Sequence, residues 1–291
     1  MKHKTLTLIG VAAASMLMLA GCASGGGGGA GGTDAGASPT PAASFPAGST
    51  MERLSKAGKI TIGTKFDQPL FGLKGPDAPV GFDIEIGKLI AAGLGIPAKN
   101  IEWKEAVSAN REPFIATGEV DAVVATYTIN DARKQVVSFA GPYYLAGQSI
   151  LVKADNNKIK SQKDLVGQPV CSVTGSTPAA KLTEIGANPL LTDTYTNCLE
   201  PLRSGAVVAV STDNVILAGL AAQNEGEFKV VGKPFTQEPY GIGLKHDDTQ
   251  FRNFINDVLE KSYKDGSYKK AWEATAGKVL PYAPPPAVDR Y

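Results

Sequence analysis

Apolar residues recur along the chain in two patterns, one typical of strands and the other of helices. Residues 59–64 alternate apolar and polar side chains, as a half-buried strand does. Between Ile86 and Leu94, apolar or small residues recur at intervals of three and four, which predicts one buried helix face. Further strands are expected at 101–103, 120–127, 148–152, 170–173, 206–210, 230–231 and 240–244, and an amphipathic helix at 251–263. Strands that alternate with helices predict an α/β protein with parallel sheets and crossover helices.

The beginning of the chain differs from the rest. Lys2 and Lys4 precede an apolar stretch at 8–20, which is shorter than the ~20 residues of a membrane span and typical of a signal peptide core. It ends in Leu19-Ala20-Gly21-Cys22, which resembles the bacterial lipobox, where the chain is cut before a diacylated cysteine. We expect a lipoprotein signal peptide at 1–21 and lipidation of Cys22. An ordinary signal peptide with an incidental cysteine is the alternative.

Residues 22–50 predict a tether. They contain the run Gly25 to Gly29 and many Ala, Ser, Thr and Pro residues, and their only charge is Asp34. Such a segment cannot bury enough apolar surface to offset the entropy of ordering it. We expect a flexible tether with a root-mean-square reach of ~30 Å, which holds a folded body at the extracytoplasmic face of the cell membrane.

Composition excludes several classes of function. The 291 residues carry 29 basic and 28 acidic side chains, so no basic excess favours nucleic acid as a partner. The three cysteines and two histidines include no C-x-x-C pair, which argues against zinc. Walker-A and G-x-S-x-G motifs are absent, and we expect no cofactor and no metal. After lipidation of Cys22, Cys171 and Cys198 remain in an oxidising compartment, and we expect them to form a disulfide, with two buried free thiols as the alternative.

A dense motif carries a resemblance to a known family. Gly81-Phe82-Asp83-Ile84-Glu85-Ile86 resembles the signature of the polar-amino-acid solute-binding proteins of ABC importers, known as family 3. Within that family, the blocks look most like those of actinobacterial glutamate-binding lipoproteins. The resemblance covers about 50–275, and its further blocks are Gly63 to Pro69, Ser108 to Arg111, Gly118 to Asp121, Ala125 to Arg133 and Gly175 to Pro178.

The resemblance implies a fold. Family members have the type II periplasmic-binding-protein fold, in which two α/β lobes with parallel-type sheets are joined by two crossover strands and hold the ligand in the cleft. The first lobe is expected at 51–147 and 244–291, and the second at 148–243.

The resemblance also implies the residues that bind the ligand's α-groups. Arg133 and Thr128 correspond to the clamp for the α-carboxylate, a role that suits a guanidinium fork. Asp213 corresponds to the residue that binds the ammonium group, and Thr126 adds an oxygen. Without the resemblance, Arg133 would be a solvated helix arginine and Asp213 a helix N-cap. The free backbone amides of a turn that enters a helix also suit a carboxylate, and this turn is Gly175-Ser176-Thr177.

The side-chain pocket decides which amino acid binds. Ser108-Ala109-Asn110-Arg111 resembles the block of acidic-amino-acid binders, with Ser108 and Arg111 facing the ligand side chain. Lys65 lies at the end of the first strand, where such binders place a cation, although some of them have arginine there. Because a buried cation without an anionic partner is costly, glutamate or aspartate is favoured. The alternative is that Lys65 and Arg111 are surface cations.

The function that follows is transport rather than catalysis. We expect a monomeric lipoprotein that captures glutamate and delivers it to the permease of an ABC importer, with aspartate, glutamine or asparagine as alternative ligands. A dehydratase-like enzyme on the same fold is a further alternative. It would need an acid or a histidine aimed at a reacting atom, and the ligand's charges occupy the matched residues. No catalytic residue is therefore expected.

Overall fold

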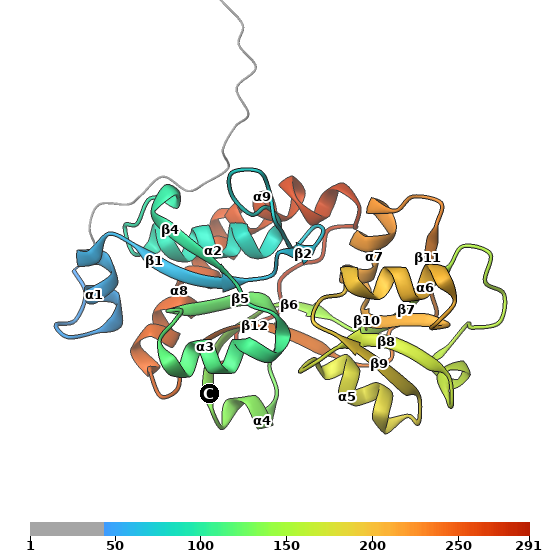
Figure 1. Cartoon of the computed structure of the whole chain (residues 1–291). Helices are drawn as coiled ribbons and strands as arrows, with labels where there is room; N and C mark the ends of the chain where they lie inside the picture. The colour runs from blue at the N-terminus through green and yellow to red at the C-terminus, as the bar shows by residue number, and fades with distance from the viewer. Residues whose placement is uncertain (1–43) are drawn as a thin grey trace, which may run out of the picture. The chain divides into compact units, whose positions relative to one another are not determined.

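Two five-stranded sheets organise the part of the chain that the structure, a computed structural model, describes, which is residues 44–291 (Figure 1). The first sheet has the order β4-β1-β5-β12-β6 and the second the order β11-β7-β10-β8-β9. The first comprises β1 Ile60–Thr64, β4 Ile101–Glu105, β5 Ala122–Thr128, β6 Val137–Ala146 and β12 Glu238–Lys245. The second comprises β7 Gln148–Lys153, β8 Pro169–Val173, β9 Asn188–Thr192, β10 Ala209–Asp213 and β11 Phe228–Val231. The expected signal peptide, Cys22 and the tether up to residue 43 lie outside the described residues.

Helices accompany each sheet. Those of the first lobe are α1 Thr50–Ala57, α2 Phe82–Gly93, α3 Arg111–Thr117, α4 Asp131–Lys134, α8 Thr249–Asp265 and α9 Ser267–Ala274. Those of the second are α5 Thr177–Glu184, α6 Leu199–Ser204 and α7 Asn214–Gln223, and a small ribbon pairs β2 Asp67–Gln68 with β3 Gly72–Leu73. No helix within residues 44–291 has the length and apolar character to cross a membrane.

Three parallel strands form one side of each sheet, as the alternation of elements predicts, and two antiparallel strands complete it. β1 pairs in parallel with β4 and β5, and β8 pairs in parallel with β9 and β10. The antiparallel members, β6, β7, β11 and β12, are the strands on either side of the two crossings between the sheets. The chain passes from β6 to β7 at Gly147 and returns between β11 and β12.

The second crossing comes earlier in the sequence than expected. β12 begins at Glu238, which pairs with Ala146 of β6, and the strand stays in the first sheet to Lys245. The expected boundary between residues 243 and 244 therefore falls inside a strand of the first sheet. The folded body also begins before Met51, because Phe45 packs edge-on against Phe254 with the ring centroids 5.5 Å apart.

The glycine of the Gly81 motif has a structural reason. Gly81 has φ +131°, and a Cβ at this position would lie 2.2 Å from the carbonyl oxygen of Phe71. Only glycine fits this approach, which lets the amides of Phe82 and Asp83 donate to Leu70 and Phe71 as α2 begins. Phe82 is then fully buried and packs edge-on against Trp272 and Tyr268.

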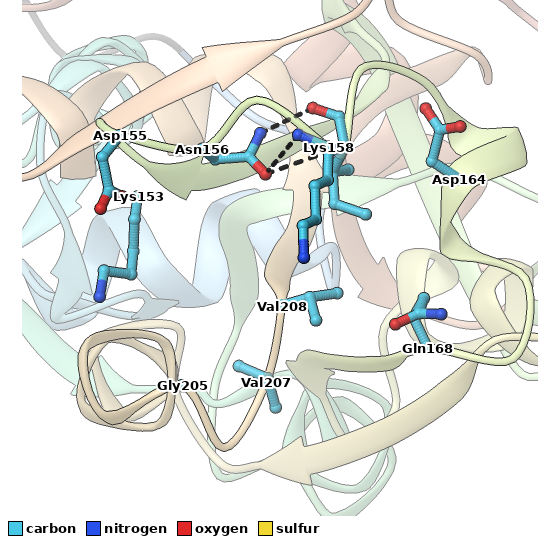
Figure 2. A pocket seen from close by; sticks show the side chains of 10 residues that line it. Lys153, Asp155, Asn156, Lys158, Asp164, Gln168, Gly205, Val207 and Val208 are labelled. Atoms are coloured by element: carbon cyan, nitrogen blue, oxygen red, sulfur yellow. Dashed lines mark hydrogen bonds between the residues drawn. The ribbon is translucent and has the colours of Figure 1, made fainter.

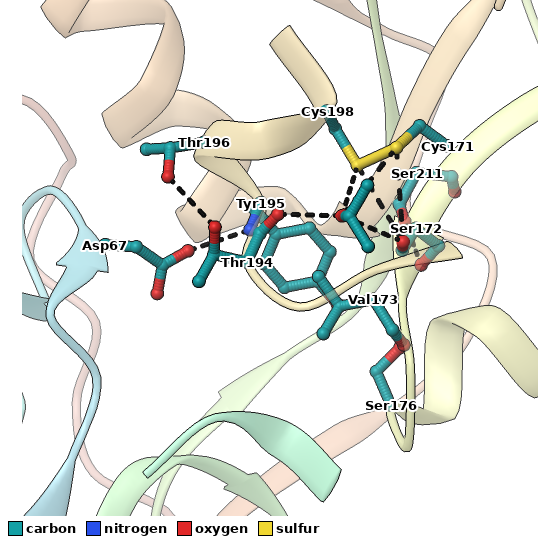
Figure 3. The surroundings of a disulfide bond; sticks show 11 residues. Asp67, Cys171, Ser172, Val173, Ser176, Thr194, Tyr195, Thr196, Cys198 and Ser211 are labelled. Carbon is teal, nitrogen blue, oxygen red and sulfur yellow. Dashed lines mark hydrogen bonds between the residues drawn. A yellow bond between two sulfur atoms is a disulfide. The ribbon is translucent and has the colours of Figure 1, made fainter. Parts of the chain in front are cut away.

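A disulfide joins Cys171 of β8 to Cys198, which directly precedes α6 (Figure 3). Both half-cystines are fully buried in the second lobe. The bridge fastens the loop that carries Tyr195 to the second sheet, close to the facing Asp67 of the first lobe.

Reduction of this disulfide is expected to lower stability and to leave the choice of ligand unchanged. For a sequence separation of 27, the chain-entropy account gives a loss of ~3.5 kcal/mol in the free energy of unfolding. Because the bridge lies within one lobe, the ratio of affinities for two amino acids should be retained. Denaturant unfolding and titration calorimetry, each with and without reductant, would measure both quantities. Folded, reduced protein that has lost all binding would contradict this expectation.

Candidate ligand-binding site

Side chains from both lobes line a small cavity. The first lobe contributes Gln68, Ser108, Arg111, Thr126 and Thr128, and the second contributes Ser176, Thr177, Pro178, Tyr195, Asp213 and Ile216. The space left between these side chains is about 10 Å³, which is room for about one water molecule. An amino acid could therefore be admitted only by movement of the lobes or of these side chains. Seven of the residues expected from the sequence line this cavity. Lys65 and Arg133 contact residues that line it, and Gly175 contacts Arg133.

Two buried cations meet at Ser108. The Lys65 ammonium donates to the Ser108 hydroxyl at 2.9 Å, and Arg111 Nε donates to the Ser108 carbonyl at 3.2 Å. Lys65 is 3% exposed and Arg111 is 2% exposed, so neither is a surface cation. Burial and then the nearby Arg111 lower the pKa of Lys65 to about 7. Burial and then Arg133 lower the pKa of Arg111 to about 10.

Arg133 spans the two lobes rather than facing solvent. Its Nη1 donates to the carbonyl of Thr128 at 2.7 Å, and its Nη2 donates to the carbonyl of Gly175 in the second lobe at 3.0 Å. Nε donates to Glu112 at 3.1 Å, which gives the guanidinium a carboxylate partner. Asn130 caps α4, the short helix that carries Arg133, by accepting from the Arg133 amide at 2.9 Å.

Asp213 is the last residue of β10 and stands at the N-cap position of α7. Its carboxylate does not cap the helix. Oδ2 accepts instead from the hydroxyl of Tyr240 at 2.6 Å, and Oδ1 has no hydrogen-bond partner among residues 44–291. Burial and then the nearby Glu238 raise the pKa of Asp213 to about 7. A buried carboxylate oxygen without a donor is a suitable partner for a ligand ammonium group.

Thr126 is held in an unusual conformation. Its φ of +44° lies in the left-handed region, which is costly for a β-branched residue. Asp83, the first acid of the Gly81 motif, accepts from the Thr126 amide at 2.8 Å and from the Tyr143 hydroxyl at 2.6 Å. The Thr126 hydroxyl donates to Gln68 at 2.9 Å. The motif therefore supports the site from behind, through a carboxylate that is fully buried.

The turn Gly175-Ser176-Thr177 brings the second lobe against the first. Gly175 has φ +77°, and a Cβ there would lie 2.9 Å from Cα of Ala109. The Ser176 hydroxyl caps α5 by accepting from the Ala179 amide at 3.1 Å and donates to the Val173 carbonyl. The Thr177 hydroxyl donates to Glu238 at 2.7 Å. The side chains of this turn are thus already engaged, and the Ser176 amide donates to the Val173 carbonyl at 3.1 Å, so the amides of Gly175 and Thr177 are the groups left for a ligand.

Several residues of the site were not found from the sequence. Tyr195 lies in an irregular loop, and its amide donates to the Asp67 carboxylate of the first lobe at 2.8 Å (Figure 3). Glu238 accepts from hydroxyls of both lobes. No local pattern marks these positions, because their roles arise from the approach of the two lobes. The other lining residues that were missed are Gln68, Pro178 and Ile216.

A second, larger groove lies at the other end of the second lobe. It measures about 500 Å³, and Lys153, Lys158, Asp155 and Asp164 stand around it (Figure 2). Val207 and Val208 lie on its other side, just before β10. None of the residues expected to bind a ligand lines it. Its two lysines and two aspartates give it no preference for either sign of charge.

The two lobes and the charged cavity between them define a two-lobed binding protein. Residues 60–275 match the profile of the bacterial extracellular solute-binding proteins, family 3, and the chain belongs to this family, as the Gly81 motif indicates. The fold is the type II periplasmic-binding-protein fold, which confirms the fold predicted from the sequence.

Known proteins of the family resemble the chain over most of its length. The glutamate-binding protein GluB of Corynebacterium efficiens is 45% identical over 73% of this chain and 77% of its own. The glutamine-binding protein of Geobacillus stearothermophilus is 38% identical over 84% of this chain and 94% of its own. A solved structure of an ancestral arginine-binding protein bound to glutamine has a TM-score of 0.71 and 36% identity, and the match covers 75% of this chain and 97% of that one.

Proposed function

We propose that this protein captures an acidic amino acid, with glutamate as the preferred ligand, and delivers it to the permease of an ABC importer. The observation that carries the proposal is the pair of buried cations at Ser108. Lys65 and Arg111 form no ion pair within residues 44–291, where their hydrogen bonds go to Ser108 and Ala125. An uncompensated buried charge costs several kcal/mol, and a ligand carboxylate would offset that cost.

The α-groups of the ligand have partners of both charges at the same cavity. We assign the ammonium group to Asp213 and an oxygen of Thr126. We assign the α-carboxylate to Arg133 and Thr128, together with the amides of Gly175 and Thr177, since the Ser176 amide already donates to the Val173 carbonyl. The contacts to the α-groups, which all amino acids share, then give affinity, and Lys65 and Arg111 give selectivity.

The known relatives support an amino-acid ligand, and their names leave two candidate ligands, glutamate and glutamine. GluB of Corynebacterium efficiens is named for glutamate, and the Geobacillus stearothermophilus protein for glutamine. These ligands have nearly the same shape and differ in charge, so the two buried cations favour glutamate over glutamine. Aspartate shares the charge, but its side chain is one methylene shorter.

A reaction on the ligand is not proposed. The buried acids of the site each accept a hydrogen bond, Asp213 from Tyr240, Asp83 from Tyr143, Asp67 from the Tyr195 amide and Glu238 from two threonine hydroxyls. We assign these groups to binding and to lobe contacts, and the protein as a whole to capture, hinge closure and release to the importer, as a monomer.

The experiment for the proposed function is the binding of three amino acids to the purified protein. We expect titration calorimetry to give glutamate at least ~10-fold higher affinity than glutamine, since an extra hydrogen bond to a charged group contributes ~1.5–3 kcal/mol. Aspartate should fall between them. Mass spectrometry of ligand released from denatured protein should find glutamate. A preference for glutamine would contradict the acidic pocket and retain amino-acid binding.

We also propose that Cys22 is lipidated and anchors the protein to the outer face of the cell membrane. The basis is the Leu19-Ala20-Gly21-Cys22 sequence after a short apolar stretch. Replacing Cys22 with serine should remove the site of acylation and move the protein from the membrane fraction to the soluble extracytoplasmic fraction. Fractionation and immunoblotting of both forms would measure this. A Cys22→Ser protein that stays with the membranes as wild type does would refute the anchor.

A further inference from the structure

The geometry points to Glu238 as a positioning residue that links the two lobes across the ligand cavity. The inference rests on the proposed function insofar as amino-acid binding requires the lobes to approach. Glu238 is not itself assigned to the ligand. Its effect would reach the ligand through Thr128 and Thr177, one from each lobe.

One carboxylate oxygen carries the link. Glu238 Oε2 accepts from the Thr128 hydroxyl at 2.7 Å and from the Thr177 hydroxyl at 2.7 Å. The two hydroxyl oxygens are themselves 3.4 Å apart. Thr128 ends β5 of the first sheet, and Thr177 begins α5 of the second lobe. A single oxygen atom therefore joins elements that belong to different lobes.

The carboxylate is committed to these hydroxyls. Glu238 is 3% exposed and has no ion pair with a lysine or arginine of residues 44–291. Its second oxygen accepts from the Thr236 hydroxyl at 2.8 Å. Since a carboxylate only accepts, each threonine donates its single hydroxyl proton to Glu238. Thr128 and Thr177 can then offer a ligand only their amide groups and hydroxyl lone pairs.

The position of Glu238 in the fold suits a link between lobes. It is the first residue of β12 and pairs with Ala146, the last residue of β6, so it lies where both crossings pass between the sheets. Thr128 pairs with Tyr240 on the same strand and stays beside Glu238 whatever the lobes do. Thr177 belongs to the other lobe, so its bond to Glu238 forms only when the lobes approach.

The link can be tested without reference to the ligand's side chain. Glu238→Ala removes both carboxylate oxygens and should weaken glutamate and glutamine by the same factor, about 10- to 150-fold, which corresponds to the loss of one hydrogen bond to a charged group, that from Thr177. Glu238→Gln keeps an oxygen that can accept from both threonines and should recover most of the affinity. Thr177→Val removes only the bond to the second lobe, and its effect should not add to that of Glu238→Ala in a double-mutant cycle.

A second measurement reports lobe contact directly. The Tyr195 amide of the second lobe donates to Asp67 of the first, and its hydrogen exchange therefore reports the approach of the lobes. In ligand-free Glu238→Ala, we expect this amide to exchange at least ~10-fold faster, and the amides of β5 and β10 to keep their wild-type rates. Asp248→Ala is the matched control, because Asp248 likewise accepts from a threonine hydroxyl, and from the Phe251 amide as well, but lies wholly within the first lobe.

The outcomes are distinct. If Glu238→Ala loses affinity for glutamate and glutamine by the same factor, and its Tyr195 amide exchanges hydrogen faster, the link is supported. Unchanged Tyr195 exchange, or a loss confined to glutamate, overturns it, as does additivity of Glu238→Ala and Thr177→Val. If Glu238→Ala does not fold, Glu238→Gln and Thr177→Val decide by the same two measurements. Should wild type bind neither glutamate nor glutamine, the proposed function fails, and the Tyr195 exchange alone decides the link.

Discussion

Replacing Arg133 with alanine is expected to weaken every amino-acid ligand by about 30-fold or more, because truncating one partner of a buried, hydrogen-bonded charge pair costs ~2–5 kcal/mol. All amino acids have an α-carboxylate, so the losses for glutamate, glutamine and aspartate should be alike. The structure adds a second reason for a large effect. Arg133 also donates to the carbonyls of Thr128 and Gly175, and thus contributes to the contact between the lobes.

Two further variants make this expectation specific. Arg133→Lys keeps the charge and loses the fork, so it should bind more weakly than wild type and more tightly than Arg133→Ala. Lys134→Ala removes the neighbouring cation, which contacts Asp289 and the Tyr291 ring, and should leave all affinities unchanged. Titration calorimetry of the three variants with three ligands would decide. A loss for one ligand alone would show that Arg133 reads the side chain.

The elements predicted best are those in which the spacing of apolar residues along the sequence matches the residues that are buried in the structure. The repeat between Ile86 and Leu94 predicts α2, which packs against the first sheet, and its apolar residues are buried except for the partly buried Leu89. The sequence of β6 has no such periodic spacing of apolar residues. α3 and α8 both contact it, so most of its residues are buried and they do not alternate. β9 is the reverse case, an edge strand with a proline and with Leu190 and Leu191 largely exposed.

One strand was predicted at a shifted position, and the shift matters for the site. The apolar run at 206–210 suggested a strand there, but β10 extends from Ala209 to Asp213. The first residues of the run follow the left-handed Gly205 that ends α6. The later register includes Ser211, Thr212 and Asp213 in the strand, all of them buried. Polar residues in a buried strand mark the end of the sheet that faces the cavity.

The candidate site shows where sequence reasoning ends. The family resemblance identified residues of both lobes, and seven of these line one cavity. It could not show that Arg133 donates to both Glu112 and the Gly175 carbonyl. Nor could it show that Glu238 accepts hydrogen bonds from two threonine hydroxyls. These contacts join positions that are far apart in the sequence, so only the folded chain brings them together.

The two buried cations at Ser108, Lys65 and Arg111, lead to an expectation that separates glutamate from glutamine. Replacing Arg111 with methionine should weaken glutamate far more than glutamine, by ~10- to 150-fold in the ratio of their dissociation constants, because only the acidic side chain uses the guanidinium charge. Arg111 lies over the Tyr127 ring, with Cζ 4.2 Å from the ring centroid, and methionine keeps part of this apolar contact. Replacing a buried, unpaired charge with an apolar side chain should also leave the stability of the protein unchanged or raised.

The same reasoning predicts how Lys65 and Arg111 differ. The pKa of Lys65 lies at about 7, below its ordinary value, chiefly through burial and secondly through Arg111. Removing Arg111 should therefore raise the pKa of Lys65 and leave one cation for the ligand, so that Arg111→Met retains some preference for glutamate. Lys65→Met combined with Arg111→Met should abolish the preference. Lys104→Ala, which removes a partly exposed cation of the first lobe, is the control and should leave the ratio as in wild type. If the double variant still prefers glutamate to glutamine by the wild-type factor, the assignment of the acidic side chain to this pair is wrong, whatever the affinity of the site for amino acids.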